Sequence, residues 1–210
     1  FLVPTVFLVS HRMIPFFSQS VFINYIMVRP AWGPSLMAVC VTAHAGFELS
    51  GLPQWRFLAD LPLAMAALHH TYVWQFRRSF HARLVAMLHI AFLWLGIGMS
   101  LYAAQSLVLL DGSDYFGRAP LHALGIGFLA SMIVSMASRV TLGHSGRALS
   151  ADTLTWAVLL GVNASAVLRM AGEFLPPLAQ WLNLLAALVW LAALGPWVRR
   201  YLPMYLQPRV

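Results

Sequence analysis

The sequence has very little charge and no lysine. Charged residues make up 9% of its 210 residues, and all 13 basic residues are arginine. Ordinary soluble domains carry about a quarter of charged residues. A chain with so few charges cannot cover the surface of a globule with polar groups, so its composition excludes a soluble fold and indicates lipid as the surrounding solvent.

Cysteine and the common catalytic motifs are also scarce. The one cysteine, Cys40, excludes an intrachain disulfide framework and any C-x-x-C site. The sequence contains no G-x-S-x-G, no H-E-x-x-H, no P-loop and no G-x-G-x-x-G that opens a helix after a strand. Nothing therefore supports a hydrolase or a nucleotide-dependent enzyme, and whether the chain is an enzyme at all stays open.

What the sequence does have is hydrophobic length, since 60% of its residues are apolar. Spans of about 20 residues each leave room for six or seven membrane crossings. Hydropathy and turn residues predict a partial span near 1–10, then spans near 34–52, 57–76, 82–104, 119–140, 153–174 and 180–198. We therefore expect one all-α transmembrane helix bundle over residues 1–210, with about six full spans and a partial first span.

The first residue lies inside an apolar stretch, with no initiator methionine and no charged region before it. This beginning does not match a signal peptide. It favours the tail of an earlier helix, so we interpret the chain as the C-terminal portion of a longer protein, and the rest of that protein would be its first partner.

The arginines divide unequally between the two sides when the predicted spans alternate across a bilayer. One side receives Arg12, Arg29, Arg77, Arg78, Arg83, Arg139, Arg147, Arg199, Arg200 and Arg209. The other side receives Arg56, Arg118, Arg169 and five of the six acids. The positive-inside rule makes the first side and the C-terminus cytoplasmic, as in a bacterial inner membrane protein. Because topology explains the net charge of +7, we expect no nucleic-acid partner.

Ionisable groups inside a span are costly, so each is a candidate for function. The candidates are His44, Glu48, His69, His70, His89, His122, Asn163 and Arg169. His69 and His89 fall at one depth on neighbouring antiparallel helices, as bis-histidine ligation of a haem requires. His70 points about 100° away from His69, so only one of the two can face His89. The alternative is that these are buried histidines bonded to carbonyls or serines.

A second group lies toward the outer side. His44 and Glu48 share a helix face, and together with His122 they form a possible nitrogen and oxygen site for copper or another divalent metal. A proton relay that also uses Arg169 is a rival use of these groups. Simple hydrogen bonding among them is the third possibility.

A loop at the predicted cytoplasmic end of the fourth full span is more distinctive. Two glycines, Gly143 and Gly146, surround His144 and are flanked by Arg139 and Arg147. Such a turn can hold an anion, for example a haem propionate, with backbone amides and guanidinium groups. Anchoring by positive charge is the alternative.

Three stretches resemble one protein family. LHALGIGFLASMIVSMASRVTLGHSGRAL at 121–149, LHIAFLWLGIGMSLYA at 88–103 and RMIPFF at 12–17 are similar to the NnrS family. This family comprises polytopic bacterial inner-membrane proteins associated with haem, copper and the response to nitric oxide. The resemblance covers most of the chain.

The resemblance implies a set of site residues. The motif positions are His89, His122, Arg139, Gly143, His144, Gly146 and Arg147. No match is found for His44, His69 or His70. Ser10 and His11 stand where family members tend to have glycine and arginine, which puts a family role for that loop in doubt.

We therefore expect an NnrS-like membrane protein that binds non-covalent b-type haem, with copper as a further cofactor, and takes part in nitric oxide or nitrosative-stress physiology. His89 is the residue on which the depth argument and the resemblance agree. A proton-coupled transporter that uses His44, Glu48, His122 and Arg169 is the alternative function. A membrane scaffold without a cofactor is the third.

Overall fold

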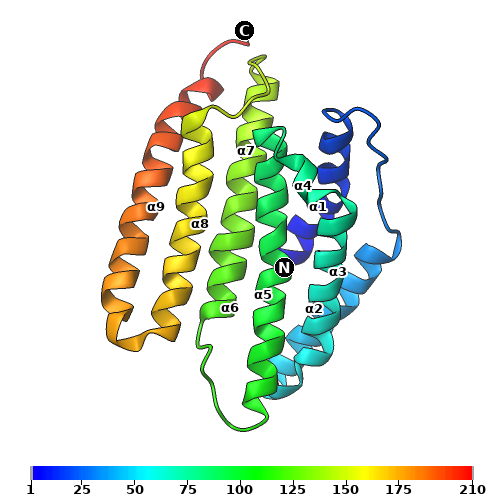
Figure 1. Ribbon diagram of the computed structural model, residues 1–210, viewed down its shortest axis with the longest axis vertical. Helices are drawn as coiled ribbons and strands as arrows, with labels where there is room; N and C mark the ends of the chain where they lie inside the picture. The colour runs from blue at the N-terminus through cyan, green and yellow to red at the C-terminus, as the bar shows by residue number, and fades with distance from the viewer. Residues whose placement is uncertain (1, 210) are drawn as a thin grey trace.

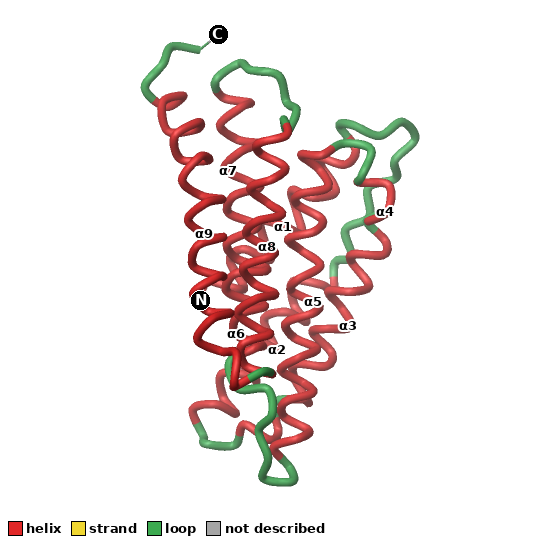
Figure 2. Tube along the Cα trace, turned by 60° about the vertical axis from the view of Figure 1, so that its left-hand side comes forward, coloured by secondary structure: helices red, strands yellow, loops and turns green. Residues whose placement is uncertain are grey.

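The computed structural model describes residues 2–209, and throughout these residues it consists of helices and connecting loops without a strand. The helices run side by side along one long axis, and most loops gather at the two ends (Figures 1 and 2). The α-helices are α1 (Leu2–Gln19), α2 (Trp32–Leu49), α3 (Phe57–Val73), α4 (Phe76–Ser79), α5 (Arg83–Leu109), α6 (Ala119–His122), α7 (Ser131–His144), α8 (Thr153–Phe174) and α9 (Ala179–Tyr201). The predicted all-α bundle is confirmed.

Four stretches of helix are long and apolar enough to cross a membrane. They are Arg83–Leu109, Ala119–His144, Thr153–Phe174 and Pro176–Tyr205. These correspond to the last four predicted spans, and the predicted bounds 153–174 coincide with α8. The earlier predicted spans are also helices, α1 to α3, but they are not among these four, so the predicted number of spans is confirmed only in part. The first of them, α1, runs to Gln19 rather than ending near residue 10.

Burial decreases from the middle of the bundle to one edge. In α5, 72% of the most apolar window is buried, whereas the corresponding figure for α9 is 11%. A helix that is apolar all round belongs in the interior or in lipid. The central helix α5 packs against α3 and α7, while α9 packs mainly against α8 and leaves an apolar face uncovered (Figure 1).

A π-helical segment, Ala123–Ala130, joins α6 to α7 in one continuous rod. Gly127 of this segment lies against the indole of Trp94 in α5, in space that a Cβ would fill. The Trp94 indole donates to Asn163 of α8, and Asn163 donates to Ser131 Oγ over 3.3 Å. Asn163, a candidate for function in the sequence, therefore ties three helices together.

The segment between α1 and α2, residues 20–31, has no regular helix and descends along the bundle to the start of α2 (Figure 1). Side chains satisfy its carbonyl groups: the Trp74 indole donates to the Val28 carbonyl over 2.9 Å, and Arg78 donates to that of Ile23. Irregular backbone at membrane depth is tolerated where protein buries it in this way.

The end of α7 and the start of α8 are fixed by local hydrogen bonds. Gly146 adopts a φ of +77°, and the Arg147 amide donates to the Leu142 carbonyl over 3.1 Å, which is the Schellman pattern that ends a helix. The residue that caps α8 is Asp152, whose Oδ1 accepts from the Thr155 amide over 2.8 Å. The helix therefore begins at Thr153.

Charge also separates along the bundle. The arginines of α4 and of the last turn of α9 lie at the same end as the C-terminus, and the acidic loop after α5 lies at the opposite end (Figure 1). The predicted separation of arginines from acids along the bundle agrees with this placement. The assignment of the arginine-rich end to the cytoplasm stays a prediction.

Candidate functional site

Two imidazoles meet in the interior between α1 and α3. His11 and His70 are 8% and 0% exposed, and their ring centroids lie 5.3 Å apart. Aromatic rings enclose them: Phe7 lies 5.8 Å from the His11 ring, and Trp74 lies 5.1 Å from the His70 ring. The pair therefore lies in an apolar, water-poor pocket made by helices that are distant in sequence.

One nitrogen of His70 is held and the other has no partner. Its Nδ1 donates to the Ala66 carbonyl, one turn earlier in α3, over 2.6 Å. This bond places the proton on Nδ1 and leaves a lone pair on Nε2, the tautomer that metal-ligating histidines commonly use. The Nε2 atom is buried and has no hydrogen-bond partner among the described residues. A buried nitrogen left in this way calls for an explanation.

The free nitrogen faces Gly33, the second residue of α2. A Cβ at Gly33 would lie 2.8 Å from His70 Nε2 and 3.3 Å from His11 Nε2. Both Nε2 atoms therefore approach the same point, and only glycine leaves that point open. His11 Nε2 also donates to the Pro30 carbonyl over 3.2 Å, so residues 20–31 form one wall of the site.

This arrangement suits one ion with two imidazole ligands. No group of three or more histidine, cysteine, aspartate or glutamate side chains that could hold a metal occurs within residues 2–209. A site with only two protein ligands is the opposite of a closed structural site, because coordination positions remain for another molecule. Imidazole nitrogen suits copper, zinc, iron and nickel.

The predicted pair of His69 with His89 is not brought together. His89 is 1% exposed in α5, hydrogen-bonds with Ser18 of α1 over 3.1 Å, and lies behind Phe76. His69 is exposed and packs beside Trp32 instead. Of the two neighbouring histidines in α3, it is His70 that turns inward, because one residue corresponds to about 100° of rotation.

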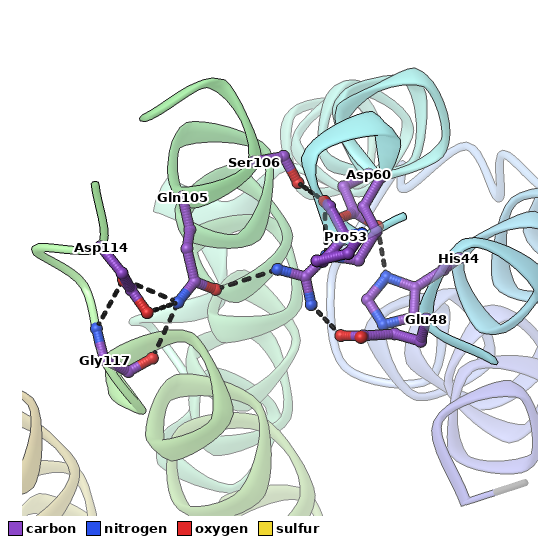
Figure 3. A network of polar contacts seen from close by, with 9 residues as sticks. His44, Glu48, Pro53, Asp60, Gln105, Ser106, Asp114 and Gly117 are labelled. Carbon is purple, nitrogen blue, oxygen red and sulfur yellow. Dashed lines mark hydrogen bonds and ion pairs between the residues drawn. The ribbon is translucent and has the colours of Figure 1, made fainter. Parts of the chain in front are cut away.

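At the opposite end of the bundle, the acid Asp60 is buried at the start of α3. Its Oδ1 accepts from His44 Nδ1 of α2 over 2.6 Å, and its Oδ2 has no partner among the described residues. The ring of Tyr102 lies 5.2 Å from the His44 ring (Figure 3 shows the His44–Asp60 pair). The sequence placed Asp60 toward the outer side but did not identify it as the partner of His44.

Arg56 organises the charges beside this pair. Its guanidinium group donates to Glu48, to Gln105 Oε1 over 3.2 Å and to the Pro53 carbonyl over 3.1 Å. Gln105 in turn donates to Asp114 Oδ1 over 3.1 Å, so the network continues into the loop after α5 (Figure 3). We call these residues the Arg56 network.

The predicted metal site of His44, Glu48 and His122 does not form. His44 pairs with Asp60 and Glu48 pairs with Arg56, whereas His122 lies 3.4 Å from Glu173 of α8. The four residues of the predicted transporter path fall into two groups, His44 with Glu48 and His122 with Arg169. Arg169 interacts electrostatically with His122 and lines a cavity of about 220 Å³ between α8 and α9.

The predicted anion loop is divided too. The Arg139 guanidinium stacks 4.0 Å from the centre of the Phe17 ring of α1. Arg147 donates to Gln207 over 2.7 Å, and the exposed His144 lines a cavity of about 240 Å³ beside it. Arg139 is thus engaged with α1, and the three side chains have separate partners, so an anion site made by all three stays a prediction.

A cavity of about 770 Å³ lies at the arginine-rich end of α3 and α4. Its walls include Leu68, Tyr72 and Phe76, and Arg77 and Arg78 lie beside them. This volume is within the range that encloses small organic ligands, roughly 300–1,000 Å³. No histidine lines it among the described residues.

Sequence reasoning missed His11, which the structure places in the site. The predicted first span ended near residue 10, so His11 was assigned to a loop. The continued helix puts Phe7 and His11 on one face, four residues apart, and this spacing was the available signal.

Comparison with known proteins gives one match. The family model described as NnrS protein matches residues 1–209 of the chain. No curated protein and no solved structure matches it.

Proposed function

Since the chain belongs to the NnrS family, we propose that it is a membrane protein of the nitric oxide response that holds a metal ion between His11 and His70. The observation that carries this proposal is the buried Nε2 of His70, which has a fixed tautomer and no partner. Copper is the metal we propose, because imidazole is a good copper ligand and the family resemblance implies copper.

The chain supports such an ion in three ways. Ala66 orients the His70 ring through its carbonyl, and Gly33, which has no side chain, lets both Nε2 atoms approach α2 closely. The aromatic rings of Phe7 and Trp74 keep water away from the pair. When bound, the ion supplies open coordination positions to which a small diatomic molecule such as nitric oxide attaches.

Haem, the other cofactor that the resemblance implies, does not fit between these histidines. The ring centroids of His11 and His70 lie 5.3 Å apart with Gly33 packed beside them, which leaves no space for a porphyrin. His89 has Ser18 and Phe76 on its sides, and no ring contact with a second imidazole occurs there among residues 2–209. We therefore derive no chemistry through haem, and haem binding stays a prediction.

The test of the metal proposal compares two neighbouring histidines of α3. The purified protein is loaded with Cu(I) under anaerobic conditions, and the bound metal is measured by mass spectrometry and by competition with a chelator. We expect one ion per chain in the unaltered protein and at least about a tenfold loss of affinity in His70→Gln and in His11→Gln.

The matched control is His69→Gln, because His69 is adjacent in sequence but exposed. It should bind copper as the unaltered protein does, and adding nitric oxide should change the spectrum of both loaded proteins. Full copper binding by His70→Gln would refute the site. A Soret band in the protein that survives His89→Ala would separately refute haem ligation by His89.

A further inference from the structure

A second polar cavity lies at the arginine-rich end of the bundle, where α7 ends, α8 begins and α9 ends. It has a volume of about 310 Å³, and its polar lining includes Arg147, Asp152 and Arg200. The Schellman turn at Gly146 places Arg147 at this cavity, and the last turn of α9 supplies Arg200. The cavity is separate from the imidazole pair.

The guanidinium group of Arg147 is only partly used. One of its terminal nitrogens, Nη2, donates to Gln207 over 2.7 Å. The other, Nη1, is buried and has no hydrogen-bond partner among the described residues. A buried cationic donor without an acceptor is costly, and an anion in the cavity would satisfy it.

The charges around the cavity leave an excess of one positive charge. Arg200 Nη2 lies 2.8 Å from Asp152 Oδ2, and both side chains of this pair are about half exposed. Asp152 is also held by the cap of α8, where its Oδ1 accepts from Thr155. Arg200 therefore neutralises Asp152, and Arg147 supplies the attraction for an anion.

The outer surface of α9, the helix that ends at the cavity, is apolar. Leu188 and Leu191 of α9 are 56% and 67% exposed, and Leu202, directly after the end of α9, is 58% exposed. A ligand that combines an anionic head with acyl chains would satisfy Arg147 and cover this face at the same time. Basic pockets between membrane helices on the cytoplasmic side bind anionic lipid headgroups in this manner.

We propose that the cavity lined by Arg147 and Arg200 binds the phosphate group of an anionic phospholipid, whose acyl chains lie along α9. The guanidinium of Arg147 donates to the phosphate oxygens, and Arg200 adds a second donor from α9. The bound lipid joins the α7–α8 loop to the exposed edge helix.

The test titrates the purified protein in detergent with short-chain phosphatidylglycerol, with short-chain phosphatidylcholine and with inorganic phosphate. Binding is measured by native mass spectrometry and by the melting temperature. We expect phosphatidylglycerol to bind and to raise the melting temperature, and the other two to do neither. Equal binding of inorganic phosphate, or of phosphatidylcholine, would overturn the assignment to an anionic lipid.

Three variants place the lipid at this cavity. Arg147→Gln should weaken phosphatidylglycerol binding about tenfold, and Arg147→Lys, which keeps the charge but loses the fork, should weaken it less. Arg199→Gln is the matched control, because it removes the same charge from the neighbouring position of α9 outside the cavity. An equal loss in Arg199→Gln would show that net charge alone attracts the lipid and would overturn the site.

A fourth variant should strengthen lipid binding instead of weakening it. Asp152→Asn keeps a residue that caps helices well but removes the negative charge at the cavity and releases Arg200. We expect phosphatidylglycerol to bind several times more tightly to this variant than to the unaltered protein. Unchanged or weaker binding would contradict the placement of the phosphate beside Asp152.

Discussion

Helix α3 carries two buried ionisable side chains, each with one partnered and one unpartnered polar atom, in different surroundings. His70, in its last turn, faces another imidazole and aromatic rings, and its Nε2 has no partner. Asp60, in its first turn, is equally inaccessible but is paired with His44, and charged groups that are paired with one another lie beside it. The two residues are about 15 Å apart along the helix.

This difference in surroundings distinguishes a binding site, the imidazole pair, from a group of residues that holds helices together, the Arg56 network. We call the Arg56 network the structural clamp. The Arg56 network joins α2, α3, α5 and the loop after α5 through bonds among its own members (Figure 3). A network that is largely satisfied holds helices in place. The imidazole pair has an unpartnered nitrogen, Nε2 of His70, and only the glycine Gly33 packs beside it, as a ligand site requires.

The largest expected effect is on the clamp. Arg56→Ala would leave Gln105 Oε1 and Glu48 without their cationic donor, so we expect the free energy of unfolding to fall by about 3 kcal/mol. Thermal or denaturant unfolding in detergent measures this loss. Copper binding per folded chain should not change, because the imidazole pair lies at the other end of α3.

The control for this variant is Arg118→Ala, which removes the same charge at the same end from an exposed side chain. It should change the free energy of unfolding by less than about 0.5 kcal/mol. A similar loss in both variants, or loss of copper in Arg56→Ala, would break the distinction between clamp and site.

The second prediction acts on the site and uses two glycines of α2. Gly33→Ala would place a Cβ 2.8 Å from His70 Nε2, so we expect copper affinity to fall by about tenfold or more and the free energy of unfolding to fall by about 1–3 kcal/mol. Gly46→Ala meets nothing within 4 Å. It should bind copper normally and gain about 0.5 kcal/mol from reduced backbone entropy. Equal copper binding in the two variants would contradict the convergence on Gly33.

The smallest expected effect is on the stability of the protein at acidic pH. Burial opposes the ionisation of Asp114, but hydrogen bonds from the Gln105 amide and from the amides of Phe116 and Gly117 hold its pKa below the usual value. A lowered folded-state pKa stabilises the protein above the unfolded value of about 3.9, and this stabilisation is lost as pH falls through the folded-state pKa. The melting temperature of the protein should therefore decrease when the pH is lowered below about 4.

Asp114→Asn tests that assignment, since asparagine retains a carbonyl acceptor but does not titrate in this range. We expect a shallower fall in melting temperature with acid for this variant. An identical acid profile would assign the pH dependence to another group, and a fall in copper binding would link the loop to the site.

Composition and hydropathy were sufficient for the all-α fold and for the last four helices, because a long apolar run leaves few structural options. They were insufficient for α1 to α3. In that region helices are shorter or interrupted by polar residues, and the bend after α1 is set by contacts from Trp74 and Arg78 that hydropathy does not contain.

The site was less predictable than the fold, because it depends on the direction in which each side chain leaves its helix and not only on how deep the residue lies along the bundle. Depth placed His69 and His89 at one level, but a single residue of rotation turned His70 inward and His69 outward. His89 is buried, as expected of a functional or structural histidine, yet its partner is the hydroxyl of Ser18. Arg147 was singled out from the sequence as a donor for an anion, which stays a prediction, whereas its neighbour at the cavity, Arg200, comes from a helix that begins more than thirty residues later.

One consequence follows from the bond between His11 and Pro30. The same Nε2 atom that would bind the ion now donates its proton to the Pro30 carbonyl, and it cannot do both at once. Capturing the ion therefore releases a carbonyl in the descending segment 20–31, which must find a new donor or shift. Metal binding should therefore change the hydrogen-exchange protection and the protease sensitivity of that segment. A spectroscopic label attached there would report the bound metal without contacting it.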